Sequence, residues 1–345
     1  MEPTRAEVVE YARTLGIDAT QPEDKEMLWI AYERLKHQAA SSTPWDAPTI
    51  SAASPIELPS TNGVQFGNSN DSSGNLSARS QPISPPSSGD WHIDNAAVVE
   101  TEAELRAAIQ GAGGLAKATV VVRMGAVIQL SRELDITRSV RLVGERAGSP
   151  TARGAGGVMA TIVGAKGEDE GGLSGNVLTA KGHQVTVEVE GLRIEGIGGR
   201  FDHAIGVEGG ASLTAVRCEV AGSRTKILGE GTYVELFQCR LTSSKGDGLC
   251  VYDGASVLVD GGSINDAAGT GVVADGAGAR VKLKGVRVES NGMFGFDSGV
   301  GAVAELEAGC QVQGNKKGDY VTFKDGVMSV RGKITGVHKS LIENM

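Results

Sequence analysis

Residues 248–288 read GLCVYDGASVLVDGGSINDAAGTGVVADGAGARVKLKGVRV and hold nearly two copies of one pattern. In each copy a short apolar run leads to an Asp-Gly pair, then to a run of alternating side chains, and finally to a triplet that ends in Ile or Val. Alternation places every second side chain on one face of a strand. The stretch therefore predicts short strands separated by tight turns, repeated along the chain.

The closing triplet recurs between residues 192 and 334. Its copies are Leu192-Arg193-Ile194, Cys218-Glu219-Val220, Cys239-Arg240-Leu241, Gly262-Ser263-Ile264, Val286-Arg287-Val288, Cys310-Gln311-Val312 and Gly332-Lys333-Ile334. Successive copies lie 26, 21, 23, 24, 24 and 22 residues apart. We call the strands that contain these triplets the anchor strands. A repeat of about 23 residues with three short strands predicts one coil of a right-handed parallel β-helix.

Two further kinds of strand complete each expected coil. Second strands are predicted at residues 204–207, 248–251, 271–274 and 320–323, and third strands at 233–237, 256–259, 280–283 and 303–306. Of the 50 glycines, 45 lie after residue 90, where tight corners between strands require them. The predicted fold class is therefore all-β, a single-stranded β-helix of roughly nine coils.

The start of this body predicts a cap for the β-helix. Thr101-Glu102-Ala103-Glu104 forms a capping box, and Leu105 and Ile109 lie on one face of a helix that ends near Gly111. Strands are expected at 119–123, 127–130, 133–136 and 140–143. This order resembles the entry to the pectin-lyase-like superfamily over residues 91–340. The resemblance implies the fold, but the superfamily includes lyases, hydrolases, esterases and non-catalytic scaffolds.

Composition divides the chain into a helical segment at 1–46, a Ser/Pro-rich linker at 47–90 and the β-helix at 91–345. The linker composition predicts a flexible tether. The net charge is −9, which argues against binding to nucleic acid or to an anionic membrane. The start of the chain lacks the pattern of a signal peptide, and its four cysteines show no metal-ligand spacing, so we expect a reducing, cytoplasmic compartment.

Residues 1–46 predict a helical hairpin with an apolar face on each helix. The hairpin is too small for a stable core of its own, so we expect it to dock on another protein. Residues 7–46 contain the stretches Glu10-Tyr11-Ala12, Leu15-Gly16-Ile17-Asp18, Glu23-Asp24 and Leu28-Trp29-Ile30-Ala31, followed by Leu35-Lys36 and Pro44-Trp45. This pattern resembles the segment that precedes the WW domain in centriolar distal-appendage and other ciliary proteins. The resemblance implies a ciliary or basal-body location, but the strands of a WW domain do not follow. The docking candidates are Tyr11, Leu15, Leu28, Trp29 and Trp45.

Two rows of charged residues recur at the coil period. The first is an acidic row of turn residues, most of which precede glycine: Glu208, Glu230, Asp253, Asp275 and Asp325, with Asp297 nearby. Turn chemistry explains it, and a site for Ca²⁺ or for a basic partner is the alternative. The second is a basic stripe at the middle of the anchor triplets: Arg193, Arg240, Arg287 and Lys333. It is interpreted as a solvated strand face or as a contact for an acidic surface such as a tubulin tail.

No catalytic constellation is apparent in the sequence. The pair Asp202-His203 has no evident partner at the coil spacing, and Cys218, Cys239 and Cys310 occupy an inward position as small apolar groups. We therefore expect no enzyme activity, no cofactor and no metal site.

The functional prediction is a non-catalytic scaffold in a ciliary axonemal or basal-body complex. Its expected partners are other ciliary proteins, including tubulin or microtubule-associated proteins. The alternative is a carbohydrate-active β-helix enzyme. Three carboxylates within about 10 Å of one another beside an arginine on the anchor face would favour that alternative.

Overall fold

The structure is a computed structural model of the chain. It describes residues 96–111, 117–145, 159–164, 176–198, 202–322 and 326–330. The chain divides into two units, residues 1–84 and 85–345, and all described residues belong to the second. The expected hairpin and linker lie outside the described residues. So do the docking candidates Tyr11, Leu15, Leu28, Trp29 and Trp45.

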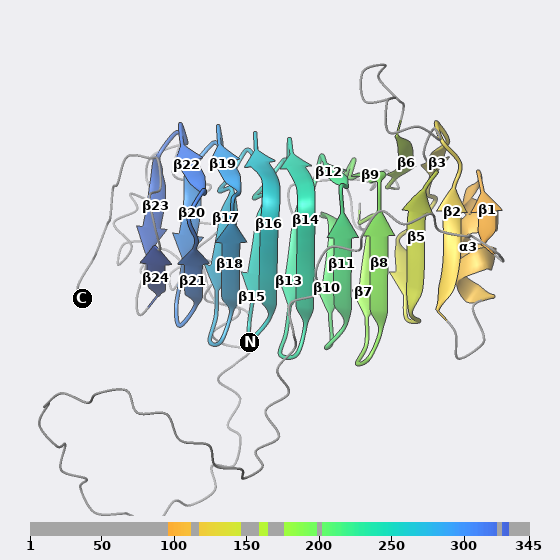
Figure 1. The fold of residues 1–345 in the computed structure, drawn as a ribbon, viewed down its shortest axis with the longest axis horizontal. Coiled ribbons are helices and arrows are strands. Elements are labelled where there is room, and N and C mark those ends of the chain that lie inside the picture. Colours follow the sequence, from red (N-terminus) through yellow and green to blue (C-terminus); the bar gives the residue numbers. More distant parts are fainter. Residues whose placement is uncertain are drawn as a thin grey trace, which may run out of the picture. The chain divides into compact units, whose positions relative to one another are not determined.

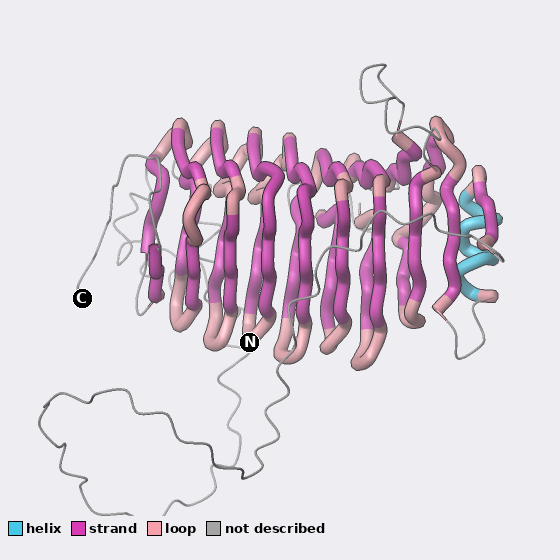
Figure 2. The backbone as a smooth tube through the Cα atoms, viewed as in Figure 1, coloured by secondary structure: helices cyan, strands magenta, loops and turns pink. Residues whose placement is uncertain are grey.

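The described part of the second unit is a stack of coils, each made of three strands (Figures 1 and 2). Every pair of hydrogen-bonded strands in it is parallel, as expected when equivalent strands of successive coils lie side by side. The strands form a sixteen-stranded and an eight-stranded sheet.

The sixteen-stranded sheet contains the third strands and the anchor strands. The third strands are β1 (Ala97–Val99), β2 (Ala118–Val122), β5 (Val140–Gly144), β8 (Thr186–Glu190), β11 (Ser212–Val216), β18 (Arg280–Lys284), β21 (Val303–Leu306) and β24 (Val327–Val330). The anchor strands are β3 (Val127–Gln129), β6 (Ala160–Val163), β9 (Leu192–Glu195), β12 (Glu219–Ala221), β19 (Arg287–Glu289) and β22 (Gln311–Gln313). Two longer strands, β14 (Tyr233–Thr242) and β16 (Ser256–Asn265), serve as third and anchor strand at once. They join the two sets into one sheet.

The eight-stranded sheet contains the second strands. They are β4 (Leu134–Ile136), β7 (Leu178–Lys181), β10 (His203–Glu208), β13 (Arg224–Leu228), β15 (Leu249–Tyr252), β17 (Val272–Asp275), β20 (Phe294–Ser298) and β23 (Gly318–Thr322). The sequence pattern did not single out β7, β13 or β20. The sequences of β13 and β20, RTKIL and FGFDS, mix charged residues and glycine with the apolar ones and hide the alternation.

The anchor register confirms the spacing of the triplets. Arg193 pairs with Glu219, Glu219 with Arg240, Arg240 with Ser263, Ser263 with Arg287, and Arg287 with Gln311. The residues on either side of this row are buried in the core. The middle of each triplet therefore points outward, as expected. The last triplet, which contains Lys333, lies outside the described residues.

Corners between strands adopt backbone conformations that favour glycine. Gly262 shows why, because its φ is +88° and an added Cβ would lie 1.9 Å from the carbonyl oxygen of Cys239 in the preceding coil. The next corner, after the anchor strand, also has positive φ in successive coils, at Gly222, Ser243, Asp266, Ser290 and Gly314. Stacked coils thus repeat their backbone conformation as well as their side-chain pattern.

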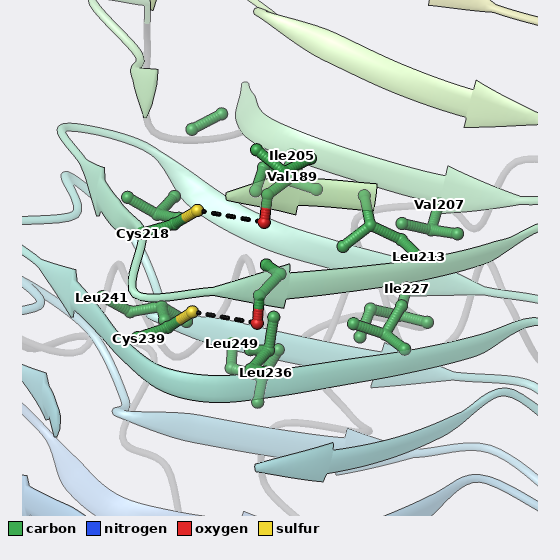
Figure 3. Close-up of a cluster of buried hydrophobic side chains, with 14 of the residues drawn as sticks. Val189, Ile205, Val207, Leu213, Cys218, Ile227, Leu236, Cys239, Leu241 and Leu249 are labelled. Atoms are coloured by element: carbon green, nitrogen blue, oxygen red, sulfur yellow. Dashed lines mark hydrogen bonds between the residues drawn. The ribbon is translucent and has the colours of Figure 1, made fainter. Parts of the chain in front are cut away.

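The interior is filled by aliphatic side chains in stacked rows (Figure 3). Cys218 and Cys239 are neighbours in one such row, and each thiol donates a hydrogen bond to a carbonyl oxygen, of Val189 at 3.5 Å and of Ala215 at 3.4 Å. Cys310 also belongs to this core. All four cysteines are free thiols, and the expected apolar role of these three is confirmed.

Helix α3 (Glu102–Gln110) lies beside β1 and β2 at the N-terminal end of the stack (Figure 1). Thr101 and Glu104 form the predicted capping box, and Leu105 and Ile109 are buried in the core. The helix thereby covers apolar side chains that the first coil would otherwise expose.

Candidate functional site on the eight-stranded sheet

The outer face of the eight-stranded sheet changes character along the stack. Its central outward row runs Asp135, Thr179, Gly206, Lys226, Cys250, Val273, Asp297 and Val321. The N-terminal part is polar, whereas Cys250, Val273 and Val321 are apolar and buried although they point away from the core. The polar side chains at the centre of this face therefore lie mainly in the first coils.

Glu133, Thr179, His203 and Asn176 form a polar cluster there. Glu133, the residue before β4, accepts hydrogen bonds from the Thr179 hydroxyl and, at 3.2 Å, from the amide of Asn176. The Nε2 atom of His203 lies 2.7 Å from Thr179 Oγ1 and 3.7 Å from Glu133 Oε1. Asn176 Oδ1 in turn accepts a hydrogen bond of 3.0 Å from the backbone N–H of His203. Three successive coils are tied together by these contacts.

The direction of the Thr179 hydrogen bonds assigns the proton on His203. A threonine hydroxyl has one proton to donate, and here it is donated to Glu133. The close contact to His203 Nε2 therefore requires the imidazole to donate. His203 is thus arranged as a donor within the cluster and not as a base that would deprotonate Thr179.

Glu133 is held in its ionised form. The nearby imidazole of His203 lowers the pKa of the Glu133 carboxyl to about 2, with further lowering by the hydrogen bonds from Thr179 and Asn176, and together these effects outweigh the opposing effect of burial. A general acid works best when its pKa lies near the operating pH. A carboxylate that stays ionised in all but strong acid is suited to accepting hydrogen bonds from neighbouring coils and so to stabilising the stack.

This cluster is absent from the sequence-based prediction. The expectation that His203 lacks a partner at the coil spacing was wrong, because Thr179 and Asn176 lie 24 and 27 residues before it, one coil away. The sequence does show a polar residue at each of these positions, and this could have indicated the cluster. Glu133 could not be aligned with them, because Leu134 and its partner Leu178 are 44 residues apart, about twice the usual coil period.

The next coils place other chemistry-bearing groups on the same face. Arg224 lies in register beside His203, and Cys250 lies 4.0 Å from a carboxylate oxygen of Asp247. Burial, followed by the charge of Asp247, raises the pKa of the Cys250 thiol to about 12. Since the thiolate is the nucleophile, a thiol with so high a pKa is unreactive at neutral pH.

The basic stripe is one continuous row as far as the structure describes it, but its members differ. Arg193 is paired with Glu219 and, at 2.9 Å, with Glu195. Arg240 and Arg287 are exposed and make no ion pair with another described residue. Glu219 and Glu195 flank Arg193. The next described carboxylate in register with Glu195 is Glu289, four strands away, so it does not join this pair.

The acidic residues do not form one row. Glu208 pairs with Leu228, Leu228 with Tyr252, and Tyr252 with Asp275, so two uncharged residues separate the first and last acids. Glu230 and Asp253 lie in the turns beyond these strands, and Asp325 lies outside the described residues. The expectation of an aligned ladder was wrong because turns of different length follow each strand. Asp297 occupies the buried central row of the sheet instead.

Two further properties of the described residues bear on possible sites. No group of three or more His, Cys, Asp and Glu side chains among them is placed to hold a metal ion. In the same ranges, no helix is long and apolar enough to cross a lipid bilayer.

Comparisons with known proteins identify the fold class. Residues 176–334 match the family model described as the right handed beta helix region, so the body is a right-handed parallel β-helix. Two solved structures are similar at 16% identity and a TM-score of 0.33, each over 69% of this chain. They are the A-module of a mannuronan C-5 epimerase from Azotobacter vinelandii, with 83% of its length covered, and an alginate lyase from a Paenibacillus species, with 76% covered. No curated protein matches the chain.

Proposed function

We propose that this protein is a non-catalytic docking component of a ciliary axonemal or basal-body complex, with the β-helix as a rigid scaffold for other proteins. The observation that supports it most is the state of the Glu133 cluster. Its carboxylate is held ionised by neighbours that belong to other coils. Such an arrangement stabilises the stack and leaves the carboxylate without a proton to donate at neutral pH.

The proposed contact surface is the anchor face around Arg240 and Arg287. These exposed arginines lie two coils apart, or about 9.6 Å, because neighbouring strands are about 4.8 Å apart. Ser263 lies between them but is buried and donates its hydroxyl to Asn265, whereas Gln311, which follows Arg287, is exposed. The surface therefore offers the donors of Arg240, Arg287 and Gln311 along one line. This row of cationic side chains suits a partner with an acidic surface, such as tubulin. Residues 7–46 are the second proposed contact, on the strength of their resemblance to ciliary proteins.

Localisation in ciliated cells tests this proposal. Tagged full-length protein should stay with cilia or basal bodies after detergent extraction and leave them at raised salt. A variant without residues 1–46 and the double variant R240E/R287E should each be retained less. The matched control is R280E/K316E, which reverses two exposed cations outside the row. Diffuse full-length protein that detergent alone extracts would refute the proposal.

One observation favours an enzyme that acts on a uronic-acid polymer as a second candidate. Glu133, His203 and Arg224 lie near one another on the outer face of one sheet, and such enzymes use clustered carboxylate and basic groups. The assay is incubation with polymannuronate, polyguluronate and polygalacturonate, followed by measurement of new chain ends. Cleavage that is lost in both E133Q and H203A would establish this function, and intact polymers would exclude it for these substrates.

A further inference from the structure

A row of mostly apolar side chains lies on the outer face of the third strands. Its members in register are Val98, Val121, Val143, Glu190, Val216, Phe237, Asp260 and Lys284. The core contains the residues on either side of the apolar members, such as Val120, Val122 and Leu236, and does not contain the row itself. The row therefore points away from the interior of the β-helix.

Three apolar members of this row are nevertheless buried, whereas Val143 is half-buried and Val98, at the end of the row, is 49% exposed. Val121, Val216 and Phe237 have exposed fractions of 4%, 8% and 7%. Farther along the same row, Asp260 and Lys284 have side-chain exposures of 35% and 53%. Glu190, the one charged member within the apolar part, is paired with Arg141 and Arg217, at 2.9 and 2.6 Å. Its charge is thus compensated by two arginines although its own side chain is only 13% exposed.

No other described element lies over this face. Figure 1 shows β2, β5, β8, β11 and β14 with no helix or strand in front of them, and α3 at the end of the stack. Apolar side chains on the outside of a single-layered sheet are expected to be accessible to water unless polypeptide covers them. The occupant is therefore sought in the chain outside the described residues.

We propose that residues 91–95, just before β1, cross this face as a strap, with Trp91 and Ile93 packed on the apolar row. The sequence there is WHIDN, in which Trp91 and Ile93 alternate with His92 and Asp94. In an extended chain the two apolar side chains share one face, and the polar ones share the other. This alternation suits a segment with the row on one side and water on the other.

The reach of the chain fits this placement. The segment leads directly into β1, whose Val98 is the first member of the row. Val143 lies two strands from β1, about 10 Å, and Val216 lies four strands away, about 19 Å. An extended chain spans about 3.4 Å per residue, so Ile93 reaches Val143 and Trp91 reaches Val216.

The fluorescence of Trp91 tests the strap. In full-length W29F/W45F, Trp91 is the sole tryptophan. Its emission should be blue-shifted, and acrylamide should quench it several-fold less than in the unfolded chain. Adding V216S should move the emission to the red and raise the quenching. The matched control V303S makes the same change at an outward position of β21, away from the row, and should have no effect.

Each other outcome overturns the proposal. Emission typical of water-exposed tryptophan in the parent excludes the strap, whether or not V216S folds. A blue shift that grows with protein concentration assigns the cover to a second copy of the chain. A blue shift that V216S and V303S leave equally unchanged places Trp91 elsewhere. If deletion of residues 1–46 from the parent, confirmed as folded, exposes Trp91, then those residues and not the row bury it.

Discussion

The coils before β14 and the coils after it share one plan but are stabilised by different interactions. On the eight-stranded sheet, successive partners in the early coils are 44, 27 and 20 residues apart, from Leu134 to Leu178, Ile205 and Thr225. In the late coils the steps are 24, 23, 24 and 24 residues, up to Tyr320. The early coils vary in length and the late coils repeat.

The interactions between coils follow this difference. Buried or half-buried polar groups link the early coils, as in the Glu133 cluster and in Glu190 between Arg141 and Arg217. In the late coils the same residue type recurs at the same corner. Asn291 and Asn315 are stacked there with a hydrogen bond of 2.9 Å. Even spacing allows identical positions to support one another, whereas uneven spacing requires particular charged groups to set the register.

The largest expected effect is at a late corner, in G262A. The added methyl group would meet the Cys239 carbonyl oxygen at 1.9 Å, on a backbone with φ of +88°. We expect the free energy of unfolding to fall by more than about 4 kcal/mol, measured by urea denaturation. The control G285A has a similar φ, +61°, but open space, and should cost about 1–2 kcal/mol. Equal losses in the two variants would show that the close contact with the preceding coil is not the reason why glycine is required at residue 262.

The second effect is a pH dependence confined to the early coils. The Glu133 pKa is lowered from 4.5 to about 2, so its ionised form stabilises the fold above pH 4.5, and this stability is lost as pH falls toward 2. The contribution is on the order of 3 kcal/mol. E133Q should therefore unfold more readily than the parent at pH 7, and the difference should shrink toward pH 2. A constant difference across this range would contradict the account.

The third effect concerns the asparagine corner of the late coils. In N291A, the buried N–H of Ala267 loses the acceptor that lies 3.1 Å away, and Asn315 loses a donor. An unsatisfied buried group costs about 1–3 kcal/mol, which denaturation by urea can resolve. The control is N265A, at a partly exposed position on the anchor strand. If the free energy of unfolding fell no more in N291A than in N265A, the stacked asparagines would not stabilise the late coils.

The smallest effects compare one ion pair from each region. In the late coils, Lys284 pairs with Asp260 at 2.9 Å with both side chains well exposed, so K284A should change stability by less than about 1 kcal/mol. In the early coils, Arg141 is 20% exposed and contacts Glu188 and Glu190, so R141A should cost more, about 1.5–3 kcal/mol. Thermal unfolding at low and high salt measures both. If K284A and R141A lost the same stability, ion pairs would contribute equally in the early and late coils.

The late coils could be predicted from the sequence because their period is nearly constant. The step between Arg240 and Ser263, and between Ser263 and Arg287, is the step of the triplets themselves. The inward cysteines followed from the same alignment, since Cys218 and Cys239 replace aliphatic residues at one position. The capping box at Thr101 was predictable because its hydrogen bonds are local.

The candidate site could not be predicted in the same way. Glu133 and Thr179 are 46 residues apart, so no short-range pattern links them. The acidic residues misled because Glu-Gly and Asp-Gly pairs mark turns, and turns vary in length from coil to coil. Glu208 and Asp253 look equivalent by their neighbours, yet they occupy different rows.

Titration of the Glu133 side chain shows whether its ionised carboxylate links the early coils. The carboxyl resonances of glutamate in carbon-13-labelled full-length protein can be followed from pH 7 downward, with E133Q identifying the signal of Glu133. We expect a Glu133 resonance that is unchanged until the pH approaches about 2, because the ionised carboxylate contacts residues of two other coils. A midpoint above 4.5 would contradict it, because such a carboxyl would be available as the acid of a catalytic site.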